Sequence, residues 1–278
     1  MNRTDTSWIR TRLQLAQGWS QKSLGQHFLV DQSVVTKAIT ASGLQPGESV
    51  IEIGPGMGVL SEALLEAGAV VTAFELDPVM QKILAEDLPD LTVVPGDALQ
   101  QIPLNLPKEG YRVIANIPYQ ITTPLLELFL QDKRLEESRP LSLTLLIQKE
   151  VAERLAAPAD TSNRSFLSVL AQYFCAVEII GIVPPRSFWP EPAVDSAVIN
   201  LVLHPSRRYS GEQEQRFFKF VRALFVQRRK QLKNVFAGIR GISSEEVATL
   251  FATLNLPITA RAQELSHEQW YDLFESGA

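Results

Sequence analysis

The sequence is poor in the residues that build disulfide frameworks and metal centres. It has one cysteine and three histidines among 278 residues, and the histidines lack the spacing of metal ligands. A single cysteine excludes a disulfide within the chain and fits a reducing compartment. Cys175 lies in an apolar run, so we interpret it as a packing residue. We therefore expect no metal site.

Long hydrophobic runs are also missing. Hydrophobic residues make up 45% and charged residues 21% of the chain, and no apolar run reaches the length that spans a bilayer. We therefore expect a soluble, cytoplasmic protein without a membrane partner. Residues 1–21 lack the apolar core of a secretory signal and favour a weakly amphipathic helical extension, with an organelle transit peptide as the alternative.

The net charge of −5 argues mildly against a nucleic-acid partner, because phosphate contacts require lysine and arginine. The distribution of charge points the other way, since residues 219–233 contain six basic residues and no acid. These six are the candidate RNA-binding residues; the alternative is a solvated charged face. They are Lys219, Arg222, Arg228, Arg229, Lys230 and Lys233.

The most informative stretch is an apolar segment that runs into glycines at alternate positions. Residues 49–54 predict a buried parallel strand, Gly54, Gly56 and Gly58 a tight turn, and residues 59–66 a helix. Glycines let the main chain approach a ligand, and the helix start offers free N–H groups to an anion. A plain strand–helix turn is the alternative interpretation.

The spacing around this turn selects among nucleotide ligands. Val59 stands where a dinucleotide fingerprint requires its third glycine, so NAD is disfavoured. Glu75 ends the next predicted strand, 21 residues after Gly54 (75 − 54), near the spacing of an acid that binds ribose hydroxyls. An adenosine-type ligand is therefore predicted.

Alternating strands and helices continue to Pro205, after which the pattern is wholly helical. We predict seven strands in all: 49–54, 70–75, 91–97, 111–115, 141–147, 173–183 and 197–203. The prolines of residues 184–192 predict an extended loop without regular strand pairing. The expected organisation is an N-terminal extension (1–21), an α/β domain (22–205) and a helical domain (206–278).

The fourth strand ends in Asn116-Ile-Pro-Tyr119, which carries the predicted chemistry. The Asn116 side-chain oxygen and the Ile117 carbonyl, held by Pro118, can accept from an exocyclic amine while the Tyr119 ring stacks on the base. Acceptors return electron density to a nitrogen conjugated with a ring, and no general base is needed. An ordinary turn is the alternative.

Together these motifs resemble the KsgA family of S-adenosylmethionine-dependent ribosomal RNA adenine dimethyltransferases, related to the Erm resistance methylases, over residues 22–274. The resemblance implies a class I methyltransferase fold, with a seven-stranded sheet whose last strand is reversed, followed by a small helical domain. The segments that carry it are residues 24–29, 52–58, 75–77, 96–98, 116–119, 148–150, 184–196 and 227–230.

The resemblance also assigns roles to single residues. It implies cofactor contacts from His27, Leu29, Gly54 in the loop that includes Gly56, Glu75 on the ribose, Asp97 on the cofactor's adenine amine, and Asn116, and it makes Phe188 a second stacking ring opposite Tyr119. The implied substrate is a pair of adjacent adenosines near the 3′ end of small-subunit rRNA, each dimethylated at N6, within a pre-30S particle. We expect a monomer.

Two departures from the family pattern concern RNA contacts: Ser23 replaces a basic residue, and residues 163–166 lack a Tyr-Gly pair. Two alternatives remain: an Erm-like enzyme that modifies a large-subunit adenosine, and a non-catalytic RNA-binding assembly factor. The intact Asn116–Tyr119 tetrapeptide argues against the second alternative.

Overall fold

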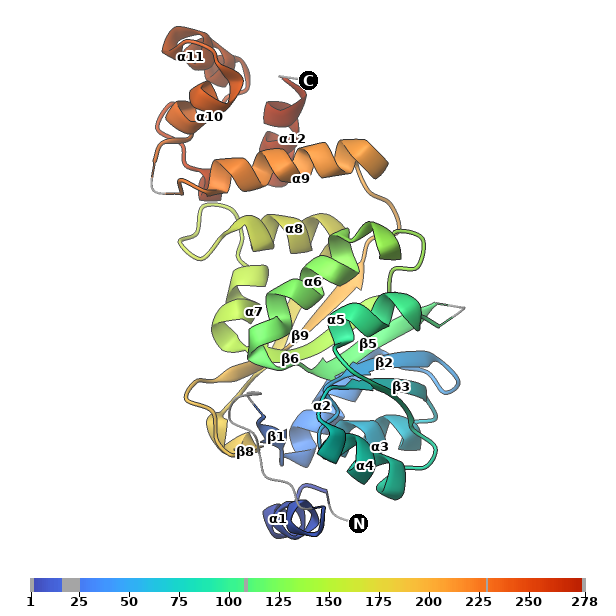
Figure 1. Ribbon diagram of the computed structural model, residues 1–278. Helices are drawn as coiled ribbons and strands as arrows, with labels where there is room; N and C mark the ends of the chain where they lie inside the picture. The colour runs from blue at the N-terminus through green and yellow to red at the C-terminus, as the bar shows by residue number, and fades with distance from the viewer. Residues whose placement is uncertain (1–2, 17–25, 108–109, 229, 277–278) are drawn as a thin grey trace. The chain divides into compact units, whose positions relative to one another are not determined.

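The computed structural model describes residues 3–16, 26–107, 110–228 and 230–276. The chain divides into two compact units: Met1–Ala152 with Ala176–Leu203, and Glu153–Cys175 with His204–Ala278. This division differs from the expected boundary at residue 205, because residues 153–175 belong to the second unit. Figure 1 traces both units along the chain.

The first unit is built on a seven-stranded sheet, so the predicted α/β fold class is confirmed. The strand order is β4-β3-β2-β5-β6-β9-β7. The first five strands in this order, β4, β3, β2, β5 and β6, are parallel, and β9 runs antiparallel to β6. The last strand is therefore reversed, as expected. The bounds are β2 (Ser49–Ile53), β3 (Val70–Glu75), β4 (Thr92–Pro95), β5 (Tyr111–Asn116), β6 (Ser142–Gln148), β7 (Cys175–Val183) and β9 (Ser196–Leu203).

Aspartates set the starts of several helices in this unit. The carboxylates of Asp31, Asp77 and Asp97 accept from backbone amides at the starts of α2, α4 and α5 and satisfy donors that have no partner within the helix. Two of these aspartates also follow strands β3 and β4, so capping fixes the carboxyl edge of the sheet. The helices are α1 (Thr6–Leu15), α2 (Gln32–Ser42), α3 (Val59–Glu66), α4 (Pro78–Asp87), α5 (Ala98–Gln101), α6 (Thr122–Gln131) and α7 (Lys149–Leu155), with 3-10 turns η2 (Ile102–Leu104), η3 (Tyr119–Ile121), η4 (Lys133–Leu135) and η5 (Pro185–Ser187).

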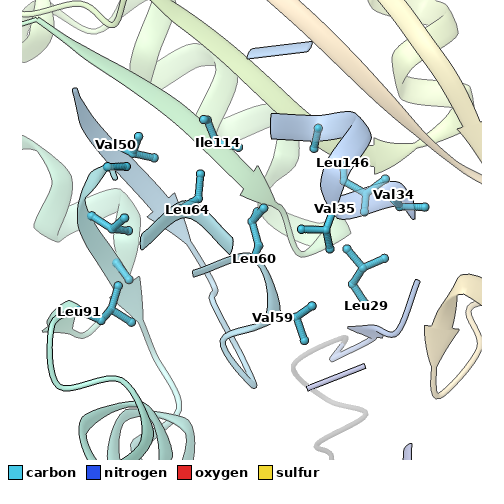
Figure 2. Packing of buried hydrophobic residues seen from close by; sticks show 14 of the residues in the cluster. Leu29, Val34, Val35, Val50, Val59, Leu60, Leu64, Leu91, Ile114 and Leu146 are labelled. Atoms are coloured by element: carbon cyan, nitrogen blue, oxygen red, sulfur yellow. The ribbon is translucent and has the colours of Figure 1, made fainter. Parts of the chain in front are cut away.

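The core beneath the site packs helices α2 and α3 on the sheet (Figure 2). Val35 of α2 and Leu64 of α3 are fully buried, and they belong to one cluster with Val50, Ile114 and Leu146 of β2, β5 and β6. Each such side chain contributes roughly 1.5–3 kcal/mol to folding. The strand ends that carry the candidate site therefore stand on a rigid base.

One prediction about the proline-rich loop is wrong. Strand β1 (Phe28–Leu29) pairs antiparallel with β8 (Phe188–Trp189), although residues 184–192 were expected to remain unpaired. The prolines flank β8 without entering it, so both of its residues keep the N–H groups that pairing requires. The amide of Val30 extends the ladder by donating to the Ser187 carbonyl at 2.8 Å.

The second unit is helical and has an aromatic core. Tyr173 packs edge-on against Phe218 at 5.0 Å between ring centroids, and Phe217 packs against Phe274 at 5.4 Å. Residues 173–174 were predicted to be strand but end α8, because no glycine or proline separates them from β7, which begins at Cys175. The bounds are α8 (Phe166–Phe174), α9 (Gly211–Phe225), α10 (Leu232–Arg240), α11 (Ser244–Thr253), α12 (His267–Glu275) and η6 (Ala262–Glu264).

Capping boxes start two helices of this unit, Ser243 with Glu246 at α11 and Ser266 with Gln269 at α12. Cys175, the single cysteine of the sequence, is buried. Within the described ranges, every helix is too short or too polar to cross a membrane.

Candidate active site

A pocket opens at the carboxyl edge of the parallel strands, where open α/β sheets bind their ligands. The loops after β2, β3, β4 and β5 contribute to it, together with the residues around β1 and β8. All of the residues predicted to bind the cofactor or the target base line this one pocket. They are His27, Leu29, Gly54, Gly56, Glu75, Asp97, Asn116, Ile117, Pro118, Tyr119 and Phe188.

The glycine loop, predicted to bind the cofactor, lies next to the turn predicted to bind the target base. Gly54 has φ +63°, and a methyl group at its Cα would lie 3.4 Å from the Pro118 side chain. At Gly56, with φ +54°, the same atom would lie 3.2 Å from the Phe28 ring. The left-handed backbone and the close neighbours both favour glycine. The Asn116–Tyr119 turn therefore lies directly beside the glycine loop.

Glu75 closes this loop from the next strand. Its Oε2 accepts from the Gly56 amide at 3.1 Å and its Oε1 from the Asp77 amide at 2.8 Å. Burial raises the pKa of Glu75, although these amide donors act in the opposite direction. The carboxyl group sits on the pocket wall with its oxygens fixed by the main chain.

The far wall combines a polar and an apolar residue. Asp97 is partly exposed, and its Oδ1 accepts from the Leu99 amide at 3.0 Å. Leu76, next to Glu75, is 54% exposed and lines the same pocket. Sequence reasoning missed Leu76; an apolar side chain immediately after a predicted ligand-binding acid is the signal that could have found it. An exposed leucine beside two carboxylates suits the flat face of a purine.

A third acid on the pocket wall, Glu52, was not predicted as a site residue. Glu52 is 1% exposed, and its Oε2 accepts from the Ser61 hydroxyl at 2.6 Å. Burial raises its pKa to about 8, and the nearby Glu75 carboxylate adds to the rise. The signal in the sequence is an acid inside an otherwise apolar strand. Near neutral pH this carboxyl group is mostly protonated.

Asn116 is oriented with its oxygen side available. Its Nδ2 donates to the His27 carbonyl at 3.3 Å, which fixes the assignment of nitrogen and oxygen in this amide. The next amide, of Ile117, donates to the Leu146 carbonyl at 3.1 Å and ties the turn to β6. The arrangement presents Oδ1 as an acceptor.

The Tyr119 ring is held on two sides. The His27 ring lies nearly parallel to it, with centroids 6.1 Å apart and planes at 27°. The Tyr119 hydroxyl lies 2.7 Å from the Ser196 hydroxyl at the start of β9. Burial raises the pKa of Tyr119, and the Ser196 bond partly offsets this. No sequence pattern indicates the Ser196 contact, because the two residues are 77 positions apart.

His27 and Phe188 come from the paired strands or their immediate neighbours. His27 Nδ1 lies 2.6 Å from the Pro190 carbonyl, and since a carbonyl only accepts, Nδ1 carries the proton. Phe188 is 2% exposed and packs in the same cluster as Val35 and Leu64 while lining the pocket. The ring that lies parallel to Tyr119 is therefore His27, and the stacking role of Phe188 stays a prediction.

Comparison with known proteins identifies the family of the chain. The sequence profile of one family, described as ribosomal RNA adenine dimethylase, matches residues 19–278. The chain belongs to the ribosomal RNA adenine dimethylase family. Membership places it among S-adenosylmethionine-dependent methyltransferases and confirms the resemblance stated from the motifs.

Curated relatives of this dimethylase carry the name ribosomal RNA small subunit methyltransferase A. The protein from Synechocystis sp. is 39% identical over 276 residues, covering 91% of this chain and 94% of its own length. The protein from Chlamydia muridarum is 34% identical and covers 99% of this chain and 98% of its own.

Two solved structures share the architecture of the dimethylase. A dimethyladenosine transferase from Plasmodium falciparum has a TM-score of 0.73 at 25% identity and covers 89% of this chain and 96% of its own. The 23S rRNA methyltransferase ErmE has a TM-score of 0.71 at 26% identity and covers 90% and 99%.

The basic residues predicted to bind RNA belong to the second unit of the dimethylase, whereas the residues that line the pocket belong to the first. Lys219 and Arg222 are exposed on α9, and the Arg222 guanidinium lies 4.1 Å from the centre of the Phe166 ring. Arg228 donates to the Ser162 carbonyl. Lys230 is exposed and Lys233 is half-buried; Arg229 lies outside the described residues, as do residues 17–25 with Ser23.

The described part of the dimethylase contains no group of three histidine, cysteine, aspartate or glutamate residues that could hold a metal ion. The carboxylates of the pocket instead face main-chain amides and a hydroxyl. These carboxyl oxygens are hydrogen-bond acceptors, which suits the hydroxyl and amino groups of a nucleoside as donors.

Proposed function

We propose that this protein transfers methyl groups from S-adenosylmethionine to N6 of two adjacent adenosines near the 3′ end of small-subunit rRNA. The observation that supports this best is the contact between the glycine loop and the Asn116–Tyr119 turn, since Gly54 and Pro118 line one pocket. Donor and acceptor sites therefore share a wall.

The pocket residues fit the cofactor. Glu75 is the acceptor for the ribose hydroxyls, Asp97 for the adenine amine, and Leu76 the apolar contact for the adenine face. The loop at Gly54 and Gly56 lets the main chain approach the methionine end. His27, Leu29 and Asn116 complete the proposed set. When bound, S-adenosylmethionine supplies an electrophilic methyl group on sulfonium.

The protein's own residues prepare the target amine. Asn116 Oδ1 and the Ile117 carbonyl accept N–H bonds from N6, which turns the nitrogen lone pair toward the methyl group. If the methyl group passed from sulfur to nitrogen, the carbon–sulfur bond would break as the nitrogen–carbon bond formed, and N6 would become acidic and give its proton to water or to these acceptors. Two transfers to each adenosine, four in all, would complete the reaction; in the second transfer the amine has one N–H, which one of the two acceptors would receive.

The target base must leave its stack to enter the pocket. Tyr119 provides one stacking face, held by His27 and Ser196, and we assign Phe188 the second. The helical unit, through the six basic residues between Lys219 and Lys233, binds rRNA phosphates. In this role the protein acts as a monomer on a pre-30S particle in the cytoplasm.

The decisive experiment is methyl transfer from radioactive S-adenosylmethionine to unmethylated small ribosomal subunits. The wild-type protein should label two adjacent adenosines, mapped by mass spectrometry, and Asn116→Ala should abolish labelling while leaving RNA binding nearly intact. Large ribosomal subunits are offered in a parallel reaction: labelling confined to large-subunit RNA, the substrate class of the ErmE relative, would overturn the proposal, and so would full activity of Asn116→Ala.

A further inference from the structure

The N-terminal helix α1 is not part of the region matched by the family profile, which begins at residue 19. It nevertheless belongs to the first unit and packs on it. Ile9 and Leu13 of α1 are buried in one cluster with Phe28, Met57 and Met80. Phe28 and Met57 also line the pocket. The helix therefore lies against the back of the pocket wall.

Arg3, just before this helix, makes the most specific contacts. It is 3% exposed, and its guanidinium donates through Nη1 to the Met57 carbonyl at 3.0 Å, through Nε to Glu62 Oε1 at 3.1 Å and through Nη2 to the Asp87 carbonyl at 3.2 Å. The Trp8 ring lies 5.2 Å from the guanidinium carbon. One side chain thus joins the glycine loop, α3 and the end of α4.

The Met57 carbonyl, to which Arg3 donates, belongs to the glycine loop. Met57 stands between Gly56 and Gly58, both in left-handed conformations. Glycine loops lose more conformational entropy on ordering than other segments, so their shape depends on outside contacts. Glu75 holds the Gly56 amide from the pocket wall, whereas Arg3 is not among the lining residues and holds the following carbonyl from behind.

We propose that residues 3–16 form a strap that keeps the glycine loop in its cofactor-binding conformation, with Arg3 as the positioning residue. The inference rests on the proposed function, because it assigns the loop to S-adenosylmethionine. Arg3 does not touch the cofactor. It acts by reducing the freedom that the loop would otherwise lose on binding, so it controls cofactor affinity and leaves the chemical step unchanged.

The test compares Arg3→Met with the wild type in the full-length protein, using S-adenosylmethionine and unmethylated small subunits. The KM for S-adenosylmethionine and its Kd by calorimetry should rise roughly tenfold, the effect of losing a charge-assisted hydrogen bond. The kcat at saturating cofactor and the KM for subunits should stay within about twofold. Arg3→Lys should give an intermediate value, since an ammonium cannot reach all three acceptors.

Arg12→Met is the matched control on the same strap. Arg12 pairs with Glu86 and with Asp87 at 2.9 Å, and neither contact involves the glycine loop. This change should lower the melting temperature without a comparable rise in cofactor KM. Equal rises in both variants, or an unchanged KM in Arg3→Met, would overturn the role of Arg3.

A loosened loop leaves the rate at saturating cofactor close to that of the wild type, whereas unfolded enzyme stays inactive at any cofactor concentration. A rate of Arg3→Met that stays low at saturating cofactor would show that Arg3 serves folding alone and would overturn the inference. An inactive wild-type protein would refute the proposed function itself.

Discussion

Glu52 is a carboxyl group kept away from water inside a strand. Its burial raises the pKa to about 8, compared with about 4.5 in a solvated chain. Between these values the folded protein binds a proton that the unfolded chain has released, so folding becomes less favourable as pH rises. A buried acid paired with a cation usually has a lowered pKa and stabilises the fold more as pH rises. The opposite pH dependence therefore distinguishes the contribution of Glu52.

We expect the wild-type free energy of unfolding to fall by about 1.4 kcal/mol per pH unit within the window from pH 4.5 to 8, from this group alone. Glu52→Gln keeps an acceptor for Ser61 and cannot ionise, so it should remove most of that slope and gain stability relative to the wild type toward pH 8. Urea unfolding at pH 5, 6.5 and 8 measures both proteins. Glu75, whose pKa burial also raises, accounts for a remaining slope; parallel curves for the two proteins would contradict the assignment.

Ser196 sits on the last strand yet acts at the target site. Its hydroxyl lies 2.7 Å from the Tyr119 hydroxyl, and it is fully buried. Because a buried hydroxyl without a partner is costly, this bond fixes the plane of the ring that we assign to base stacking. Tyr119 keeps its stacking face even when the hydroxyl is removed.

Ser196→Ala and Tyr119→Phe should each lower kcat/KM for small subunits by roughly fivefold, the effect of one hydrogen bond of about 1 kcal/mol. Because both changes remove the same bond, the double variant should be no worse than either single variant. Steady-state kinetics on the three variants and the wild type completes the cycle. Losses that multiply would show that the two hydroxyls act separately.

At the scale of elements, the sequence predicted the longer strands. It missed elements that are very short or that have no residue marking their end. Strands β2, β3 and β5 were predicted because each is a mostly apolar run that is followed directly by glycine or that ends in a polar residue. The two-residue strands β1 and β8 are too short to show a period of two. Helix α8 was missed because it runs directly into β7 at Cys175, with no glycine or proline to mark its end, and because its aromatic last residues favour a strand.

The site divides in the same way. The glycine loop, Glu75 and the Asn116–Tyr119 turn are contiguous motifs and could be placed at one sheet edge from topology alone. Arg3 and Ser196 reach that edge from positions 54 and 77 residues away from their partners Met57 and Tyr119. An isolated arginine or serine carries no local signal of such a contact, since only the folded chain brings the partners together.

The basic surface of α9 gives a prediction for an element. Lys219 is exposed there, so Lys219→Ala should weaken rRNA binding about equally for all sequences and reduce the slope of log K against log salt by about 1. Filter binding between 50 and 200 mM salt measures the slope. Lys82→Ala, an exposed lysine on α4 of the other unit, is the control; an unchanged slope for Lys219→Ala would indicate a solvated charge.

The two units of the whole molecule divide the proposed work. Every residue that lines the pocket belongs to the first unit, while the candidate RNA-binding residues belong to the second. Discrimination between target adenosines therefore need not come from the pocket, which meets a single base. We expect the choice of rRNA site to depend on the helical unit, and the chemistry to depend on the sheet edge.

The pairing of β1 with β8 has a consequence for biosynthesis. Phe28 and Trp189, partners in this ladder, are made 161 codons apart (189 − 28), and β7 has its neighbour in the sheet only once the later strand β9 exists. A nascent chain can therefore shape its glycine loop early, but it cannot close the pocket until residue 189 has emerged from the exit tunnel. An enzyme proposed to modify young ribosomes is thus completed only in the last third of its own translation.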